Sequence, residues 1–311
     1  MNRTPRPQEI PARVIESFGR RVRIEMPDGT RCAAELFGRR LSVVCGDEVR
    51  VRPSSRGDAP RVVAVAPRRT LFARTDSRGR TEPLAANLSL LAVIVAPQPT
   101  PDPFVADRYL AGAAYAGIEA AVVASKTDLP DAATPPFVEL LAEYEQAGYT
   151  VLRTSATTGA GIDALRGLLD GQLAMLVGQS GVGKSSLTNL LAPESGRLTR
   201  TLSDATGEGR HTTVSTALFK VPSGGELIDS PGVRDYAPAL VDDATVQQGW
   251  KEMVGLAPQC RFHNCLHLRE PGCAVRAAVE SGDIAARRYE SYKRLLNIMR
   301  DLAPEYERRR P

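Results

Sequence analysis

Residues 178–185 read GQSGVGKS, and this stretch decides the fold of the chain around it. It matches the pattern G-x-x-x-x-G-K-[ST], with an apolar run at Ala174–Val177 before it and a helical pattern at Ser185–Leu191 after it. Between a strand and a helix, such glycines let backbone N–H groups surround nucleotide phosphates. We expect Lys184 to reach the β- and γ-phosphates and Ser185 to ligate Mg²⁺. The predicted phosphate-binding residues are Gly178, Gln179, Ser180, Gly181, Val182, Gly183, Lys184, Ser185 and Ser186.

A second motif follows about 45 residues downstream. Residues 228–232 read IDSPG and end a short apolar strand that starts at Glu226. Nucleotide hydrolases place an aspartate associated with Mg²⁺ at this point, so Asp229 is the predicted residue. The N–H group of Gly232 is expected to contact the γ-phosphate, so that hydrolysis releases the segment after it.

The base-reading signal lies upstream of these two motifs. Residues 125–128 read SKTD after the apolar run Ala120–Ala124 and resemble the N-K-x-D motif of GTPases. That likeness implies that the Asp128 carboxylate accepts the guanine N–H groups and that the stem of Lys126 lies over the base. Ser125 stands where Asn is usual, which we expect to weaken a structural hydrogen bond more than base reading. Thr154, Ser155 and Ala156 resemble the S-A-K motif, whose backbone contacts the guanine oxygen.

The order of these motifs is unusual, because the guanine motifs precede the phosphate-binding loop. A circular permutation explains this order, since a parallel sheet survives when old ends are joined and new ends are opened at the surface. From about Leu71 the sequence predicts an α/β domain with a mostly parallel sheet. The expected strands are Leu88–Val95, Ala120–Ala124, Thr150–Arg153, Ala174–Val177, Ala217–Val221 and Glu226–Ile228. The expected helices are Phe104–Ala116, Phe137–Ala147, Ile162–Leu169 and Ser185–Leu191.

Residues 1–70 have a different pattern, with short β-like runs separated by turn residues. The runs are Ala12–Phe18, Arg20–Met26, Arg31–Leu36, Glu48–Arg52 and Arg61–Ala66. Five short strands in about 60 residues predict a small all-β barrel. An OB-fold is the main candidate because its open face binds oligonucleotides, although an SH3-like barrel would show a similar pattern. Phe18 and Phe37 are the main aromatic residues, so we expect contacts to the nucleic-acid backbone more than base stacking.

The positive charge of the chain is concentrated at its N-terminal end. The net charge of the 311 residues is +4, but residues 1–80 contain 18 Arg, no Lys and 9 acidic residues, so the remainder is acidic. Clustered guanidinium groups bind phosphates in bidentate fashion and release counterions from nucleic acids. A solvated surface is the alternative explanation, and nucleic acid is the leading predicted partner.

A third unit, residues 237–311, has a mainly helical pattern interrupted by a cysteine cluster. Cys260, Cys265, His267 and Cys273 have the spacing C-x4-C-x-H-x5-C, which predicts a structural Zn²⁺ site with four protein ligands. His263 is the competing imidazole ligand. The total of five cysteines argues against a disulfide framework, and Cys32 and Cys45 are expected in the barrel core. The last helix, from Ile284 to about Leu302, is expected to present a second basic face with Arg287, Arg288, Lys293, Arg294 and Arg300.

Taken together, the motif order, GQSGVGKSSL, GRHTT at 209–213, IDSPGVR and the cysteine cluster followed by EPGCAV closely resemble the RsgA family of bacterial small ribosomal subunit biogenesis GTPases. The resemblance covers nearly the whole chain. It implies an OB-fold, a circularly permuted GTPase and a zinc domain, with one structural Zn²⁺ and His267 as its imidazole ligand. It also implies binding of rRNA and GTP hydrolysis stimulated by the small (30S) ribosomal subunit during its late maturation.

In that family the segment matching residues 209–213 is the first switch. The resemblance implies that Thr212 or Thr213 meets Mg²⁺ and the γ-phosphate, and that His211 is catalytic alongside Lys184. The sequence offers a physical motive for His211. Val233 follows IDSPG, where other GTPases have the Gln that orients the attacking water, so another side chain must take that role.

The sequence also bounds the setting and the competing functions. The N-terminus MNRTPRPQEIPAR lacks the apolar core of a signal peptide, and no run approaches the roughly 20 apolar residues of a membrane span, so a cytoplasmic protein without membrane contact is expected. We also expect a monomer. One alternative is a nucleic-acid-binding module whose nucleotide site is a switch without appreciable turnover. Another is an ATP-dependent enzyme, which Lys126 and Asp128 disfavour.

Overall fold

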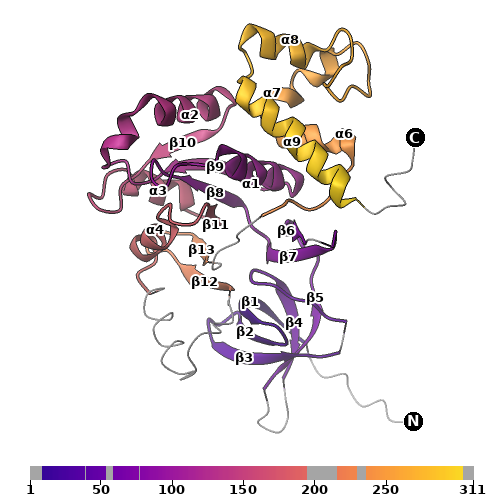
Figure 1. The fold of residues 1–311 in the computed structure, drawn as a ribbon. Coiled ribbons are helices and arrows are strands. Elements are labelled where there is room, and N and C mark those ends of the chain that lie inside the picture. Colours follow the sequence, from indigo (N-terminus) through magenta and orange to yellow (C-terminus); the bar gives the residue numbers. More distant parts are fainter. Residues whose placement is uncertain are drawn as a thin grey trace.

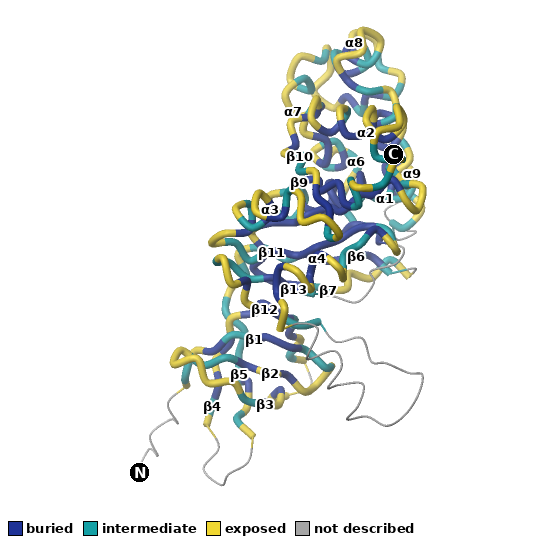
Figure 2. Tube along the Cα trace, turned by 90° about the vertical axis from the view of Figure 1, so that its left-hand side faces the viewer, coloured by how far each residue is buried: buried dark blue, intermediate teal, exposed yellow. Residues whose placement is uncertain are grey.

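The computed structural model describes residues 9–38, 40–53, 59–76, 78–194, 216–229 and 236–303. Figure 1 shows three units: a strand barrel at one end, a helix-covered sheet in the middle and a helical unit at the other end. The view turned by 90° in Figure 2 shows the same order, with the barrel and the helical unit at opposite poles. Within the described residues, no helix is both long and apolar enough to cross a bilayer.

The N-terminal unit is the predicted five-stranded barrel with OB-like strand order. β3 lies between β2 and β5, β5 pairs with β4, and β4 returns to β1. Alternate residues such as Val22 and Ile24, or Val49 and Val51, point into its core. The strands are β1 (Ile10–Phe18), β2 (Arg21–Glu25), β3 (Arg31–Leu36), β4 (Glu48–Arg52) and β5 (Arg61–Val65), each close to its predicted range.

A hairpin that the sequence did not predict follows the barrel. It consists of β6 (Leu71–Thr75) and β7 (Thr81–Ala86), which form a separate two-stranded sheet, and Arg74 of β6 also bridges to Pro238. Pro83 lies inside β7, and a proline within a run argues against a strand because it removes a backbone donor. The hairpin lies between the barrel and the central sheet in Figure 1.

The central unit has the predicted α/β architecture. Its strands are ordered β10-β9-β8-β11-β13-β12, and only β12 is antiparallel to its neighbour. β8 is fully buried along its length, as expected for a central parallel strand. The strands are β8 (Leu90–Val95), β9 (Glu119–Ala124), β10 (Thr150–Arg153), β11 (Leu173–Gly178), β12 (Thr216–Lys220) and β13 (Glu226–Asp229).

Helices cover both faces of this sheet. The core on one face combines side chains of α1 (Pro103–Tyr115) and α2 (Pro135–Gln146) with alternate residues of β8. The core on the other face combines α3 (Ile162–Leu169) and α4 (Lys184–Leu191) with the remaining residues of β8. A 3₁₀ turn, η1 (Pro130–Ala133), precedes α2.

The barrel and the central sheet share one hydrogen-bonded sheet, which the sequence did not predict. β1 pairs antiparallel with β12 through Glu16 with Ala217 and Ser17 with Thr216. This joins the two units into a single sheet of 11 strands. The arginine-rich unit is therefore attached to a strand next to β13, which ends at Asp229.

The C-terminal unit is helical and packs on α1 and α2. Trp250 and Tyr292 lie in its core, which also takes in Phe104 and Ala111 of α1. Its elements are α6 (Asp243–Val246), η2 (Gln247–Gly249), α7 (Lys251–Val254), η3 (Ala257–Gln259), α8 (Ala274–Ser281) and α9 (Ala286–Leu302).

The expectation that α9 presents a basic face is wrong for Arg287 and Arg288, while Arg294 is exposed and Lys293 and Arg300 are partly exposed. Arg288 is 1% exposed and pairs with Asp107 and Glu252, and Arg287 pairs with Asp107 and Glu143. The other three cations also have partners. Lys293 pairs with Glu290, Arg300 pairs with Asp243, and Arg294 lies over the ring of Phe104. The four arginines hold α9 to the rest of the protein because acidic and aromatic groups distant in sequence face them, whereas the Lys293 pair lies within α9.

Candidate functional site

The phosphate-binding loop lies at the carboxyl end of the parallel strands. β11 ends at Gly178, where a Cβ atom would meet the Ile94 carbonyl oxygen at 2.3 Å, so the two strands approach as only glycine permits. Lys184 begins α4, and its Nζ donates to the carbonyl oxygens of Gly178 (2.9 Å) and Gln179 (2.7 Å). Ser185 and Ser186 are exposed at the same helix start. The lysine ammonium is thus held at the start of the loop by two backbone carbonyl groups.

The predicted base-reading residues follow neighbouring strands of the same sheet edge. Ser125 follows β9, and Thr154 to Ala156 follow β10. The Ser155 hydroxyl donates to the Asp128 carboxylate at 2.6 Å, and this hydroxyl also accepts the N–H groups of Thr157 and Thr158. Asp128 is exposed, whereas Ser155 is fully buried. The carboxylate is therefore oriented by a buried partner and remains open to a ligand.

Two side chains tie the SKTD segment to the phosphate-binding loop. The buried Ser125 hydroxyl contacts the carbonyl oxygens of Val182 and Val95. Lys126 Nζ donates to the carbonyl oxygens of Gly181 (2.7 Å) and Gln98 (3.0 Å). A serine in place of the usual asparagine therefore still makes a polar link between the two motifs.

Lys184 and Asp229 are oppositely charged neighbours in this site. Burial lowers the pKa of Lys184, with the charge of Asp229 opposing this shift. Burial likewise raises the pKa of Asp229, with Lys184 opposing. Burial therefore disfavours the charged form of both side chains. The negative charge of a polyphosphate would stabilise charged Lys184, and a divalent cation would stabilise charged Asp229. The two residues therefore fit a nucleotide with a divalent cation.

Four predicted residues lie outside the part of the chain that the structure describes. These are His211, Thr212, Thr213 and Gly232. Their predicted roles remain expectations from the sequence. The first three lie between the described residues Glu194 and Thr216, and Gly232 lies between Asp229 and Tyr236.

The structure brings the predicted zinc ligands together. The Sγ atoms of Cys260, Cys265 and Cys273 and a ring nitrogen of His267 all lie within 4.8 Å of one another. Cys260 Sγ is 3.9 Å from Cys273 Sγ, and His267 Nδ1 is 3.6 Å and 3.3 Å from these two sulfurs. A tetrahedral Zn²⁺ site with usual bond lengths has S–S edges of about 3.8 Å and S–N edges of about 3.5 Å. The donor set therefore fits zinc.

Residues that the sequence analysis missed surround this cluster. Gln247 Oε1 lies 2.7 Å from His267 Nε2, which favours the tautomer with a proton on Nε2 and leaves Nδ1 free to bind a metal. Glu270 accepts the backbone N–H groups of Leu266, Leu268 and Arg269. Burial opposes its charge, but these hydrogen bonds outweigh burial and lower the pKa of Glu270 to about 2. Gln247 is 20 residues away from His267, so no local pattern could reveal it.

Comparison with known proteins identifies the family. A model described as RsgA GTPase matches residues 65–238. A Pseudomonas fluorescens protein named small ribosomal subunit biogenesis GTPase RsgA is 42% identical over 294 residues, which cover 93% of this chain and 85% of that protein. The chain belongs to the RsgA GTPase family. An Azotobacter vinelandii protein of the same name is 41% identical over 298 residues, covering 94% of this chain and 86% of that protein.

Solved structures support the same conclusion. The crystal structure of YjeQ from Thermotoga maritima matches with a TM-score of 0.71 and 28% identity, covering 94% of this chain and 99% of that one. YloQ, described as a circularly permuted GTPase, matches with a TM-score of 0.72 and 21% identity over 98% of this chain and 100% of that one, which shows the shared fold. The predictions of the family, of the permuted fold and of a GTP-hydrolysing enzyme are confirmed.

A proline-rich segment of this family member also borders the nucleotide site, and the sequence analysis missed it. Residues 97–102 read PQPTPD and begin two residues after the end of β8 at Val95. The Gln179 side chain accepts the N–H group of Asp102 at 3.0 Å and donates to the Thr100 carbonyl at 3.4 Å. Ligands of parallel sheets bind beyond the carboxyl ends of the strands, so the position of this segment after β8 was the available signal.

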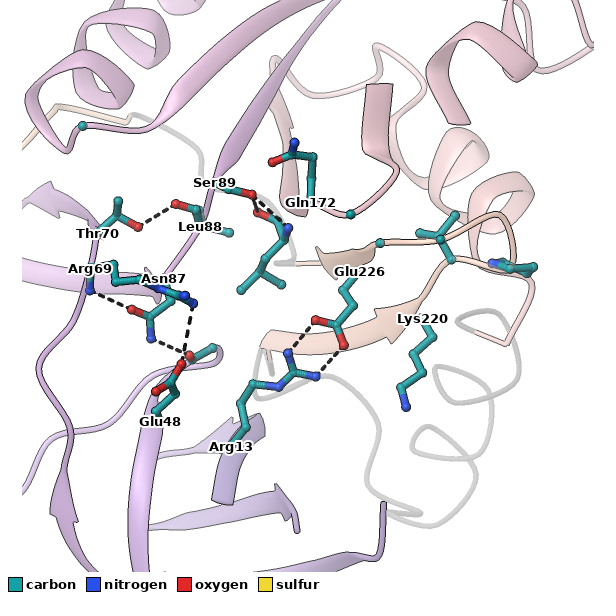
Figure 3. Close-up of a pocket in the computed structure, with 18 residues that line it drawn as sticks. Arg13, Glu48, Arg69, Thr70, Asn87, Leu88, Ser89, Gln172, Lys220 and Glu226 are labelled. Carbon is teal, nitrogen blue, oxygen red and sulfur yellow. Dashed lines mark hydrogen bonds and ion pairs between the residues drawn. The ribbon is translucent and has the colours of Figure 1, made fainter. Parts of the chain in front are cut away.

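A cleft of about 820 Å³ lies at the opposite edge of the sheet, between this RsgA-type GTPase unit and the barrel. Its lining includes Ser89, Leu173 and Glu226, at the amino ends of β8, β11 and β13. Figure 3 shows Arg13 directed at Glu226. None of the predicted site residues lines it, so the cleft is separate from the nucleotide site.

Proposed function

We propose that this GTPase acts in late maturation of the small (30S) ribosomal subunit, that this subunit stimulates its GTP hydrolysis, and that it binds rRNA. The observation that carries this proposal is the joining of an arginine-rich barrel, through β1 and β12, to the sheet that holds the nucleotide motifs. Relatives that share most of its length are named for small ribosomal subunit biogenesis. Such work takes place in the cytoplasm, and we propose a cytoplasmic monomer.

The described contacts support a division of roles within the nucleotide site. Asp128, oriented by Ser155, would read the guanine base, with Lys126 and the backbone of Ala156 beside it. Residues Gly178 to Ser186 would hold the phosphates, with Lys184 as the main cation. Ser185 and Asp229 would hold Mg²⁺, which when bound neutralises the charge that develops on the phosphates. His211 would orient the attacking water, and Thr212, Thr213 and Gly232 would sense the γ-phosphate.

The third unit would hold one structural Zn²⁺ through Cys260, Cys265, His267 and Cys273. All four ligands come from the protein, which leaves no open position for catalysis. We propose domain limits of 1–70 for the barrel, 71–236 for the GTPase and 237–311 for the zinc unit. The end of β5 at Val65 and the family match to residues 65–238 support these limits.

Multiple-turnover GTP hydrolysis with and without purified small subunits tests the proposal. We expect acceleration by small subunits and none by large subunits. His211→Ala should retain nucleotide affinity and lose the accelerated rate, whereas Lys184→Ala should lose nucleotide binding. Equal rates with and without small subunits would overturn the proposed function.

Base reading has its own test in Asp128→Asn. An amide offers one donor and one acceptor in place of two acceptor oxygens, so GTP affinity should fall and xanthosine triphosphate should gain relative to it. Lys184 and Ser125 are untouched by this change. Unchanged GTP affinity would show that Asp128 does not read the base.

A further inference from the structure

Phe37 is the most exposed large apolar side chain among the residues that the structure describes. It follows β3 and is 53% exposed, while the preceding Leu36 points into the barrel core and is 7% exposed. A single exposed apolar side chain is common on protein surfaces and needs no function. Two further features set Phe37 apart.

The first feature is a backbone held in place around the ring. The N–H group of Phe37 donates to the Val62 carbonyl oxygen at 2.9 Å. The carbonyl oxygens on both sides, of Leu36 and Gly38, accept hydrogen bonds from one guanidinium nitrogen of Arg20, each at 3.2 Å. The ring therefore projects from a fixed backbone, which lowers the entropy that is lost when a ligand covers it.

The second feature is the positive charge around this position. Glu35 precedes Phe37 by two residues. In the strand pairing it lies between Arg21 of β2 and Arg61 of β5. Among the described residues near Phe37 in the chain or across the strands, the exposed arginines are Arg20, Arg21, Arg40 and Arg61, and the exposed acid is Glu35. Guanidinium groups bind phosphate oxygens in bidentate fashion. The patch thus combines an aromatic face with phosphate-binding groups.

We propose that Phe37 stacks on an unpaired base of a single-stranded RNA segment whose phosphates contact these arginines. This inference rests on the proposed function, because it names the part of the barrel that meets RNA. Bases within a duplex are stacked on each other and leave no face for an aromatic ring, so the site selects unpaired RNA. It adds one stacked base to the backbone contacts that the sequence led us to expect.

Fluorescence of 2-aminopurine in single-stranded RNA of roughly ten nucleotides tests the stacking, since a site of this size fits one OB-type barrel. The full chain is used, with anisotropy of the same RNA for affinity and a duplex of the same sequence as comparison. Stacking on one aromatic ring corresponds to a roughly 5- to 150-fold loss of affinity on alanine substitution. Phe37→Ala and Phe37→Leu should both show this loss and the loss of 2-aminopurine quenching, whereas Phe37→Trp should retain both.

Val138→Ala is the matched control, because Val138 is 45% exposed on α2, away from the barrel. Its RNA affinity should equal that of the wild type, and basal GTP hydrolysis should be unchanged in every variant. Wild-type affinity in Phe37→Ala, full affinity in Phe37→Leu, an equal loss for duplex RNA, or no RNA binding by the wild type would each overturn the inference. Stimulation by small subunits, measured on the same proteins, tests the proposed function separately.

Discussion

The barrel and the helical unit are attached to the GTPase sheet in different ways. The interface between the barrel and the rest of the protein, called the barrel seam here, is held mostly by backbone groups. β1 pairs with β12, and the Ala86 N–H donates to the Cys45 carbonyl at 3.0 Å. The side-chain amide of Asn87 also donates to the Gly46 carbonyl at 2.9 Å. The side chains of the Arg13–Glu226 ion pair at this seam are about a quarter exposed and border the cleft in Figure 3.

The seam of the helical unit depends on particular side chains. The carboxylate of Asp107 in α1 accepts one hydrogen bond from Nη1 of Arg287 and one from Nη1 of Arg288, each at 2.7 Å. The carboxylate of Glu252 accepts hydrogen bonds from Nε and Nη2 of Arg288. Asp107 and Arg288 are each 1% exposed. Burial opposes the charge of Arg288, but the carboxylates outweigh it and hold the pKa of Arg288 well above its ordinary value.

This difference predicts how each seam responds to change. Backbone hydrogen bonds survive most substitutions, whereas a buried ion network fails when one partner is removed, because the remaining charges lose their compensation. The helical unit should therefore move with α1, and single substitutions in its buried ion network should weaken its attachment. Single substitutions at the barrel seam should have smaller effects. The four changes below probe this contrast, beginning with the largest expected effect.

Loss of zinc should have the largest effect, and it should stay within the helical unit. Structural zinc contributes roughly 10–16 kcal/mol in small zinc domains, and here the ligands span residues 260–273. Chelation, or Cys265→Ala, should expose the amides of this segment and of α8 to hydrogen exchange. Hydrolysis stimulated by small subunits should fall more than intrinsic hydrolysis. GTP affinity should change little.

Cys32→Ala is the control, since Cys32 lies in the barrel and outside the cluster. Metal analysis should give one zinc per wild-type chain and none in Cys265→Ala. If intrinsic and stimulated rates fall equally, the zinc unit only supports the GTPase fold. If neither falls, the unit is dispensable for stimulation.

Asp107→Ala should be the most damaging single change to the seam itself. It leaves Arg287 and Arg288 with one carboxylate each, and breaking a buried pair costs about 3–5 kcal/mol. Native-state hydrogen exchange of α9 measures this local stability. Asp163→Ala, which removes an exposed ion pair on α3, should cost less than about 1 kcal/mol. Similar losses in the two variants would contradict the buried-network argument.

The sequence predicted the central sheet well because buried parallel strands give continuous apolar runs. β10 and α3 match their predicted ranges, and β8 and β9 differ by one or two residues. The cysteine cluster was likewise predictable, since all four ligands lie within 14 residues. In both cases the information is local, and a short stretch of sequence contains the whole signal.

The missed features depend on contacts between distant segments. In the sequence, Arg287 and Arg288 look like surface charges. Their partner Asp107 lies about 180 residues earlier in the chain, so only the fold shows that they are paired with it. The pairing of Ser17 with Thr216 uses backbone groups, which leave no mark in the side-chain pattern. Gln179 was assigned to the phosphate-binding loop, but its contacts with Thr100 and Asp102 become visible only in the structure.

Arg13→Gln at the barrel seam should have a smaller effect than Asp107→Ala. Its guanidinium pairs with Glu226 and Glu25, but these groups are partly exposed and the backbone pairing of β1 with β12 remains. We expect a loss of about 1 kcal/mol or less in the protection of the Ser17 amide. The charge swap Arg13→Glu with Glu226→Arg should recover part of it. A loss above about 3 kcal/mol would show that the barrel seam also depends on side-chain charge.

The smallest effect is expected from the pH dependence of Glu25, which lies at the barrel seam. Burial raises its pKa, but hydrogen bonds and charge from Arg31 and Lys220 outweigh burial and lower it below the usual value of 4.5. A carboxylate with a lowered pKa stabilises the folded state at pH values above its unfolded pKa, and it loses this contribution as the pH falls through its folded pKa.

Glu25→Gln should therefore lower the local stability of β1 by a few tenths of a kcal/mol, and this loss should be constant from pH 7 to about 5. The difference from wild type should shrink below about pH 4.5. Hydrogen exchange of β1, compared at each pH with the exposed-site control Glu35→Gln, measures it. A difference that grows as the pH falls would mean that Glu25 is not stabilised by its cationic neighbours, and that its ion pairs contribute nothing to the attachment of the barrel.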